Sequence, residues 1–277
     1  MFSPMSTELV GAAVLAGLAL ALGVRAVKAL RRSPLSTPQS LLFGLNYVMS
    51  RVLWRATISG TFDLPAGSGA IIVSNHRSPV DPSFFYLATR RVVRWMVARE
   101  YCIHPAMAWF FRIVESIPVG RGGIDTAATR LAIRHARAGG LVGMFPEGRI
   151  NDTSSLMIPG RPGAAMIALR ARVPIVPIYI QGSPYNGSVF GSVLLPAKVH
   201  LTIGSPIDLS DDYGRADDRA AHHEVTLRLL RQIAALAGRV EYEPRIAGRN
   251  DCQPAGRGRL LGVQASAAET PAGDANR

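Results

Sequence analysis

Cysteine is almost absent from this chain of 277 residues, which contains only Cys102 and Cys252. The two lie far apart, neither belongs to a Cys-x-x-Cys pair, and neither has a histidine at zinc-finger spacing. This scarcity excludes a small disulfide-stapled fold and fits a protein of a reducing compartment. His222 and His223 are adjacent on an expected helix, where their side chains diverge, so no histidine pair has metal-ligand spacing.

Acidic residues are also scarce, because 19 Asp and Glu stand against 31 Lys and Arg and give a net charge of +12. Such a surplus favours a polyanionic partner: a nucleic acid, an anionic bilayer or a phosphate-bearing substrate. Aromatic residues make up only 7 %, which is few for a basic face that stacks on bases. We therefore predict no nucleic-acid partner. A basic membrane- or nucleic-acid-binding protein without activity is an alternative from a different class.

The N-terminal part of the chain contains one uninterrupted run of apolar residues and glycine, residues 9–24. At about 1.5 Å per helical residue this run reaches roughly 24 Å, somewhat less than a bilayer core of about 30 Å. Basic residues follow the run and none precedes it, whereas a cleaved signal peptide has the opposite order; they are Arg25, Lys28, Arg31 and Arg32. We predict a marginal transmembrane or interfacial helix, with the following domain on the cytoplasmic side.

A second helix is predicted at residues 41–58, after a break marked by Pro34 and Pro38. Apolar residues recur there at helical spacing, and arginines lie among them. Two interpretations fit this pattern equally well: an interfacial amphipathic helix on a membrane, or an ordinary helix that packs on the following domain. The apolar positions are Leu42, Leu45, Val48, Met49, Val52 and Leu53.

From residue 60 onward, short apolar runs alternate with helical segments. The expected strands are 70–74, 141–145, 173–180 and 199–203, and the expected helices are 82–90, 125–138, 163–172 and 225–236. This alternation predicts an α/β fold with a central mixed, largely parallel sheet flanked by helices. Pro174 and Pro177 argue against a regular central strand in their segment. We divide the chain into N-terminal membrane-associated helices (1–59), a globular domain (60–245) and a disordered tail (246–277).

The first cluster with chemical potential follows the expected strand 70–74 and contains His76, Ser78 and Asp81. His76 lies just past the strand, where α/β folds place ligand sites. A turn through the proline-rich segment would return the Asp81 carboxylate to the imidazole, which makes His76 a candidate general base. The alternative is structural. Asp81 is placed to cap a helix that begins at Pro82, or Ser78 and Asp81 form a capping box.

Two later clusters combine glycine with arginine. Segment 117–123 places Arg121 between Gly120 and further glycines, so that the backbone and a guanidinium fork both come close to a ligand such as phosphate. It lacks the Walker A ending and the dinucleotide fingerprint, and a flexible surface turn is the alternative. In segment 145–149, Glu147 is a candidate acceptor for a hydroxyl, or a partner for an arginine. An exposed ion pair between Glu147 and Arg149, worth under about 1 kcal/mol, is the alternative there.

The sequence contains no Gly-x-Ser-x-Gly nucleophile elbow. What it offers is one candidate base and several arginines on loops that follow strands, with Arg161 as a further cation at the start of a helix. This set fits direct transfer, in which the base activates a hydroxyl of a bound, phosphate-bearing substrate.

Four segments in order resemble the four motifs of the 1-acyl-sn-glycerol-3-phosphate acyltransferase family. They are Asn75-His76-x4-Asp81, Val119-Gly120-Arg121, Phe-Pro-Glu-Gly-Arg at 145–149, and Val-Pro-Ile-Val-Pro-Ile at 173–178. The resemblance covers about residues 70–180. Each motif alone is weak, and the ordered set is specific. A Thr often follows the Glu-Gly of the third motif, where this chain has Arg149, so the phosphate geometry departs from the family pattern.

The resemblance implies that His76 takes the proton from the acceptor hydroxyl and that Asp81 orients the imidazole. It implies an acyl thioester donor, either acyl-CoA or acyl-carrier protein, a lysophospholipid acceptor, a membrane bilayer as partner, and neither metal nor other cofactor. Segment 173–178 is implied to form part of the donor side. The implied substrate-binding residues are Asn75, Ser78, Gly120, Arg121, Glu147, Gly148, Arg149 and Arg161.

The resemblance favours one acceptor, and several others are alternatives. The favoured acceptor is 1-acyl-sn-glycerol 3-phosphate, which would give phosphatidate for phospholipid biosynthesis. Glycerol 3-phosphate, another lysophospholipid and a lyso-aminolipid require the same chemistry. A His/Asp hydrolase, which would release the acyl group to water, is a further alternative.

Overall fold

The computed structural model describes residues 11, 14, 17, 35–120 and 125–248. Its strands are β1 (Thr57–Ser59), β2 (Ala70–Ser74), β3 (Val93–Ala98), β4 (Ile117–Val119), β5 (Leu141–Met144), β6 (Ile175–Gln181) and β7 (His200–Ile203). Its helices are α2 (Thr37–Val52), α3 (Asp81–Thr89), α4 (Arg99–Cys102), α5 (Ala108–Ile113), α6 (Thr126–Arg137), α7 (Gly163–Ala171), α8 (Val189–Leu194), the 3-10 helix η1 (Ser210–Arg215) and α9 (Arg219–Leu236).

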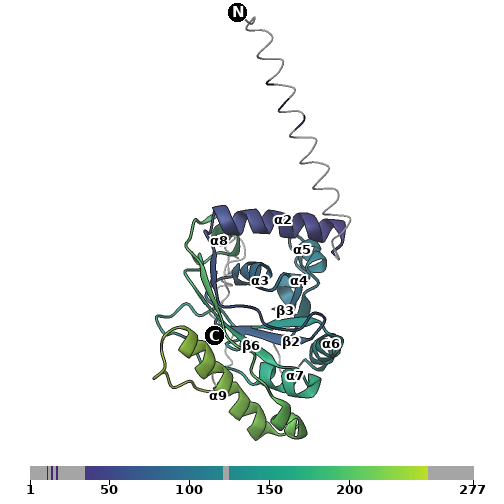
Figure 1. The fold of residues 1–277 in the computed structure, drawn as a ribbon, viewed down its shortest axis with the longest axis vertical. Coiled ribbons are helices and arrows are strands. Elements are labelled where there is room, and N and C mark those ends of the chain that lie inside the picture. The colour runs from purple at the N-terminus through teal and green to yellow at the C-terminus, as the bar shows by residue number, and fades with distance from the viewer. Residues whose placement is uncertain (1–10, 12–13, 15–16, 18–34, 121–124, 249–277) are drawn as a thin grey trace, which may run out of the picture.

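The strands form one sheet in the order β1-β7-β6-β2-β5-β3-β4. Five strands from β6 to β4 run parallel, whereas β7 is antiparallel to β6 and pairs in parallel with β1. The predicted α/β fold with a mixed, largely parallel sheet is confirmed. Helices α6, α7 and α9 cover one face, and α2 and α3 lie on the other (Figure 1).

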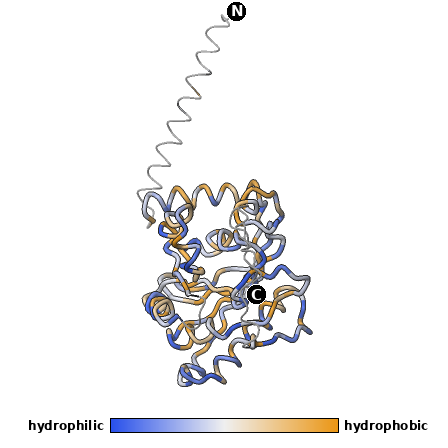
Figure 2. The backbone as a smooth tube through the Cα atoms, turned by 180° about the vertical axis from the view of Figure 1, so that it is seen from behind, coloured by the Kyte–Doolittle hydropathy of each residue, from blue (hydrophilic) through white to orange (hydrophobic). Residues whose placement is uncertain are grey.

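Strand β2 lies at the centre and is buried along its whole length. Ile71 and Val73 pack with α6, α7 and α9, whereas Ala70 and Ile72 pack with α3. This alternation follows from the strand geometry, in which successive side chains point to opposite faces. A five-residue strand buried on both faces is typical of a parallel sheet covered by two helical layers. In Figure 2 the central strands accordingly carry hydrophobic colour.

The argument against a regular central strand at 173–180 is wrong, because β6 lies between β2 and β7. Pro174 precedes the strand, and its carbonyl accepts the amide of Ile71. Pro177 lies opposite Gly204, one residue past the end of β7, and accepts its amide at 2.9 Å. The proline nitrogen therefore falls where the β7 ladder has ended, and the sheet loses a single backbone hydrogen bond there.

The helix predicted at 41–58 begins earlier and ends earlier. Ser36 caps α2 in a capping box with Gln39, and the helix ends at Val52. Trp54, two residues past the end of the helix, is only 2 % exposed. The backbone of residues 53–54 pairs with residues 197 and 199, so tertiary pairing overrides the helical pattern after Val52.

Two predictions concern segments that the structure mostly leaves out. The apolar run 9–24 and the basic residues after it fall outside the described residues, apart from three positions. None of the helices within the described ranges is long and apolar enough to cross a bilayer. Of the predicted tail 246–277, only the first residues are described; Ile246 bridges Gly160, and the amide of Ala247 donates to the Gly160 carbonyl at 2.9 Å.

Candidate active site

The candidate residues gather at the carboxyl edge of the parallel strands. His76 follows β2, Phe145 follows β5, and Gly120 follows β4. The register of β2 and β5 places Val73 beside Met144, so the loops that leave these two strands emerge side by side. Ligand sites in α/β sheets form at this edge because adjacent loops diverge there.

The His76–Asp81 pair predicted from the sequence is present. His76 Nδ1 lies 2.9 Å from Asp81 Oδ2. The imidazole is 15 % exposed and the carboxylate is fully buried. No other described residue forms a hydrogen bond with the imidazole, so Nε2 lies free for a substrate. A histidine held through Nδ1 with Nε2 open has the geometry of a general base.

Asp81 does not cap the helix that follows it. The N-cap of α3 is Val80, without a side-chain hydrogen bond. Asp81 Oδ2 instead accepts the amides of Arg77 at 2.7 Å and Ser78 at 2.8 Å, which lie before it. The capping interpretation is therefore wrong. The turn formed by residues 76–78 wraps around the carboxylate, and these donors stabilise its charge away from water.

Ser78 and Asn75, both predicted to bind substrate, use their polar atoms inside the protein. The Ser78 hydroxyl donates to the Pro184 carbonyl, so the proposed capping box does not form. Asn75 exchanges two hydrogen bonds of 2.9 Å with the backbone of Ile180 in β6. These contacts hold the His76 turn to β6 and to the loop after it.

Glu147 joins two loops of the site. Its Oε1 accepts the His76 amide at 2.7 Å, and its Oε2 accepts the Ile158 amide at 2.9 Å. The residue is only 2 % exposed, and burial raises the pKa of this carboxyl to about 7 against the opposing effect of the two amides. Both oxygens are thus occupied by backbone donors, which gives Glu147 a role in positioning the backbone of His76.

The predicted phosphate-binding residues lie on the same edge. Arg149 is exposed, and Arg161 is half-buried beside Gly148, where a Cβ would come within 3.1 Å of its Nε. Gly148 also has a φ of +69°, so the backbone there favours glycine. The Gly120 amide donates to Asp125 at 3.0 Å. Arg121 lies outside the described residues, and its placement stays a prediction.

Sequence reasoning missed three residues around His76. The Phe145 ring stacks on the imidazole with centroids 3.8 Å apart. Arg77 donates to the carbonyls of Asn151 and Thr153, and the Asn151 amide donates to the His76 carbonyl at 2.8 Å. Phe145 is the first residue of the motif at 145–149, and this position is the sequence feature that could have identified it. The other two act through backbone contacts that no sequence pattern marks.

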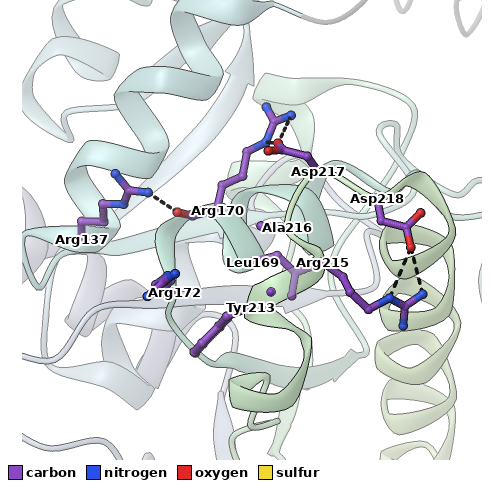
Figure 3. A pocket seen from close by; sticks show the side chains of 10 residues that line it. Arg137, Leu169, Arg170, Arg172, Tyr213, Arg215, Ala216, Asp217 and Asp218 are labelled. Carbon is purple, nitrogen blue, oxygen red and sulfur yellow. Dashed lines mark hydrogen bonds and ion pairs between the residues drawn. The ribbon is translucent and has the colours of Figure 1, made fainter.

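A cleft of about 500 Å³ lies at the opposite edge of the sheet, between the ends of α6 and α7 and the segment before α9 (Figure 3). Arg170 pairs there with Asp217 at 2.9 Å, and Arg215 with Asp218 at 3.0 Å. None of the candidate site residues lines this cleft. Within the described ranges, no group of three or more His, Cys, Asp or Glu is arranged to hold a metal ion.

Comparisons with known proteins agree with the motifs. Residues 55–181 match the family model described as Acyltransferase. The 1-acyl-sn-glycerol-3-phosphate acyltransferase of Bacillus subtilis is 27 % identical over 54 % of this chain and 72 % of its own length. Drosophila melanogaster tafazzin is 30 % identical over 53 % of this chain and 42 % of its own length.

The fold has a relative among solved structures. The 1-acyl-sn-glycerophosphate acyltransferase PlsC of Thermotoga maritima superposes with a TM-score of 0.56 at 20 % identity, over 79 % of this chain and 89 % of that one. At this identity the superposition shows a shared fold. Residues 55–181 are thus similar to the Acyltransferase family, all four ordered motifs lie within this segment, and two of the similar curated proteins are named 1-acyl-sn-glycerol-3-phosphate acyltransferase.

Proposed function

We propose that the protein transfers a fatty acyl group from acyl-CoA or acyl-carrier protein to the sn-2 hydroxyl of 1-acyl-sn-glycerol 3-phosphate, yielding phosphatidate. The observation that carries the proposal is the His76–Asp81 pair at the carboxyl edge, with Nδ1 held at 2.9 Å and Nε2 open. The name of the Bacillus subtilis relative supports the choice of acceptor.

In the proposed reaction, His76 Nε2 accepts the proton of the acceptor hydroxyl while the hydroxyl oxygen attacks the thioester carbonyl. A C–O bond forms, and the C=O electron pair moves onto the carbonyl oxygen. Collapse of this tetrahedral species re-forms C=O and expels the thiolate, which takes the proton from His76. Asp81 keeps a proton on Nδ1 and stabilises the imidazolium between these steps. The base is regenerated, and no further reactant is needed.

The phosphate of the acceptor is assigned to the arginines of the same edge. Arg161 and Arg149 form no ion pair with any residue that the structure describes, so both guanidinium groups are available to an anion. Arginine presents a planar fork that fits phosphate oxygens. Arg121, predicted from the sequence, would complete the set.

The acceptor is a lipid, and α2 offers a surface that fits a bilayer. Leu41, Leu45, Val48 and Val52 recur at helical spacing and are 56–72 % exposed, whereas the helix buries Gln39 and Ser50. Much of α2 carries hydrophobic colour although it lies at the periphery (Figure 2). We propose that this face rests on a membrane, with the active site on the cytoplasmic side. In a chain that begins at residue 35 and so lacks the predicted helix at 9–24, Leu45→Asp with Val48→Asp should weaken flotation with anionic vesicles; unchanged flotation of that shortened chain would reject this surface.

The central test is acyl transfer from labelled acyl-CoA to 1-acyl-sn-glycerol 3-phosphate by membranes that carry the full chain. Wild type should form phosphatidate, His76→Ala should not, and His223→Ala on α9 serves as the matched control. Absence of product from wild type, with acyl-CoA and with acyl-carrier protein as donors, would reject this acceptor.

A second acceptor is favoured by one observation: the tafazzin relative is as similar to this chain as the acyltransferase of Bacillus subtilis. The alternatives are glycerol 3-phosphate, another lysophospholipid and a lyso-aminolipid. A panel of these acceptors at equal concentration, compared by kcat/KM, decides among them. Acyl release to water in excess of transfer to every acceptor would instead identify a hydrolase.

A further inference from the structure

The His76 ring is held by two contacts of different kinds. The hydrogen bond from Nδ1 to Asp81, at 2.9 Å, fixes one atom of the ring. The Phe145 ring covers one face of the imidazole, with centroids 3.8 Å apart and planes within 5° of each other. A single hydrogen bond leaves a ring free to tilt about the bonded atom, whereas a parallel stack also fixes its plane. The two contacts together therefore determine where Nε2 points.

Phe145 is itself held from behind. Trp95 stacks on it with centroids 4.5 Å apart and an 18° angle between planes, and Phe85 packs edge-on against Trp95 at 4.7 Å. His76, Phe145 and Trp95 belong to β2, β5 and β3 or the residues just after them, which are neighbours in the sheet. Neighbouring strands lie about 4.8 Å apart, so the sheet itself sets a spacing suited to stacked rings.

Gly143 makes room for this arrangement. It pairs with Trp95 in the register of β3 and β5. A Cβ at this position would lie 2.5 Å from Cδ2 of the indole, closer than any side chain tolerates. The indole therefore leans over β5 toward Phe145 only because residue 143 has no side chain.

We propose that Phe145 is a positioning residue that fixes the plane of His76, and that Trp95 and Gly143 hold Phe145 in place. The inference rests on the proposed function of His76. An aromatic face also stabilises the positive charge that His76 carries between the two proton transfers. Simple core packing would require only an apolar side chain of similar size at position 145, whereas the positioning role requires a ring.

The kinetic test uses the full chain in detergent or membranes, with kcat, KM for both substrates and Tm measured for each variant. Phe145→Leu should lower kcat about ten- to hundredfold, since small misplacements of a reacting group cost up to about 10²-fold. Both KM values should stay unchanged, and Phe145→Tyr should restore most of the rate. Phe62→Leu is the matched control, because Phe62 is also half-buried against the same core. Wild-type kcat in Phe145→Leu, or an equally slow Phe145→Tyr, would overturn the proposal.

A spectroscopic measurement separates this proposal from the proposed function. In protein labelled at histidine with ¹³C, the His76 ring protons, identified by their absence in His76→Ala, should be shifted upfield by the Phe145 ring. The shift should vanish in Phe145→Leu and persist in Phe145→Tyr, and its absence from wild type would reject the stack. A slow His76→Ala beside a Phe145→Leu with wild-type kcat rejects the positioning role alone, whereas a fully active His76→Ala rejects the proposed function.

Discussion

The two edges of the sheet carry their carboxylates in opposite ways. At the carboxyl edge, Asp81 and Glu147 are buried and accept backbone amides. At the opposite edge, exposed carboxylates such as Glu224 pair with arginines, here with Arg215 at 2.8 Å. The pKa values follow the surroundings: burial raises the pKa of Glu147 to about 7, whereas the hydrogen bond from Arg215 lowers the pKa of Glu224.

The arginines of the two edges differ in whether carboxylates of the same chain pair with them. Arg170 and Arg215, in the cleft of Figure 3, are neutralised by carboxylates of the same chain. Arg149 and Arg161 form no such pair within the part of the chain that the structure describes. The arginine-lined cleft is therefore a poor indicator of the substrate site, because the charges of Arg170 and Arg215 are already paired with carboxylates. Arginines on the loops of the carboxyl edge that have no ion-pair partner among the described residues are the better guide.

The largest effect is expected from the His76–Asp81 pair. A positioned general base contributes about 10²–10⁴-fold, so His76→Ala should lower kcat by that factor. Asp81→Asn keeps the size of the side chain and removes its charge, so it should also lower kcat strongly. Turnover with saturating substrates, alongside Tm to confirm folding, measures both. Near wild-type turnover in His76→Ala would contradict the assignment of the active site to the carboxyl edge.

The next effect concerns stability and Glu147. Its pKa is raised from 4.5 to about 7 by burial, so between these values the folded protein keeps a proton that the unfolded chain has lost. The contribution of Glu147 to stability is therefore fully present below about pH 4.5 and falls by roughly 3 kcal/mol as the pH rises to about 7. Urea unfolding of wild type and Glu147→Gln at pH 5 and pH 8 checks this. The variant should lack this part of the pH dependence; identical dependence in both proteins would contradict it.

A smaller effect is expected from Arg161. Loss of one hydrogen bond from a charged group costs roughly 1.5–3 kcal/mol, which is about ten- to hundredfold in binding. Arg161→Ala should raise the KM for the acceptor by this factor and leave kcat nearly unchanged. Arg161→Lys keeps the charge and loses the planar fork of the guanidinium, so its KM for the acceptor should lie between those of wild type and Arg161→Ala. An unchanged KM in Arg161→Ala would remove this residue from the phosphate site.

Local chemistry predicted much of the frame that carries these residues. Asp125 caps α6 and accepts the amides of Ala127 and Ala128, as its position before a helical pattern indicates. The buried strands β2 and β5 were visible as short apolar runs. His76 and Asp81 were recognisable because the motifs that contain them occur in a fixed order.

What the sequence left undecided depended on contacts between distant segments. The same Asp81 fits a helix cap and a partner for His76, and only the path of the turn at residues 76–78 separates them. The stack on His76 requires β2, β5 and β3 to be neighbours, which no local pattern encodes. Pro177 was misjudged for a similar reason, because its effect depends on where β7 ends.

The smallest effect is expected at the opposite edge, from Arg215. Its two nearest partners, Asp218 and Glu224, are exposed and accessible to salt, so Arg215→Ala should change Tm little and leave kcat and both KM values at wild-type levels. Asp218 is both a partner of Arg215 and the N-cap of α9, where it accepts the Ala220 amide at 2.8 Å. Asp218→Ala should therefore lower Tm more than Arg215→Ala does, again without affecting transfer. If Arg215→Ala raised the acceptor KM as Arg161→Ala is expected to, ion pairing would no longer distinguish the two edges, and the cleft would have to be counted as part of the substrate site.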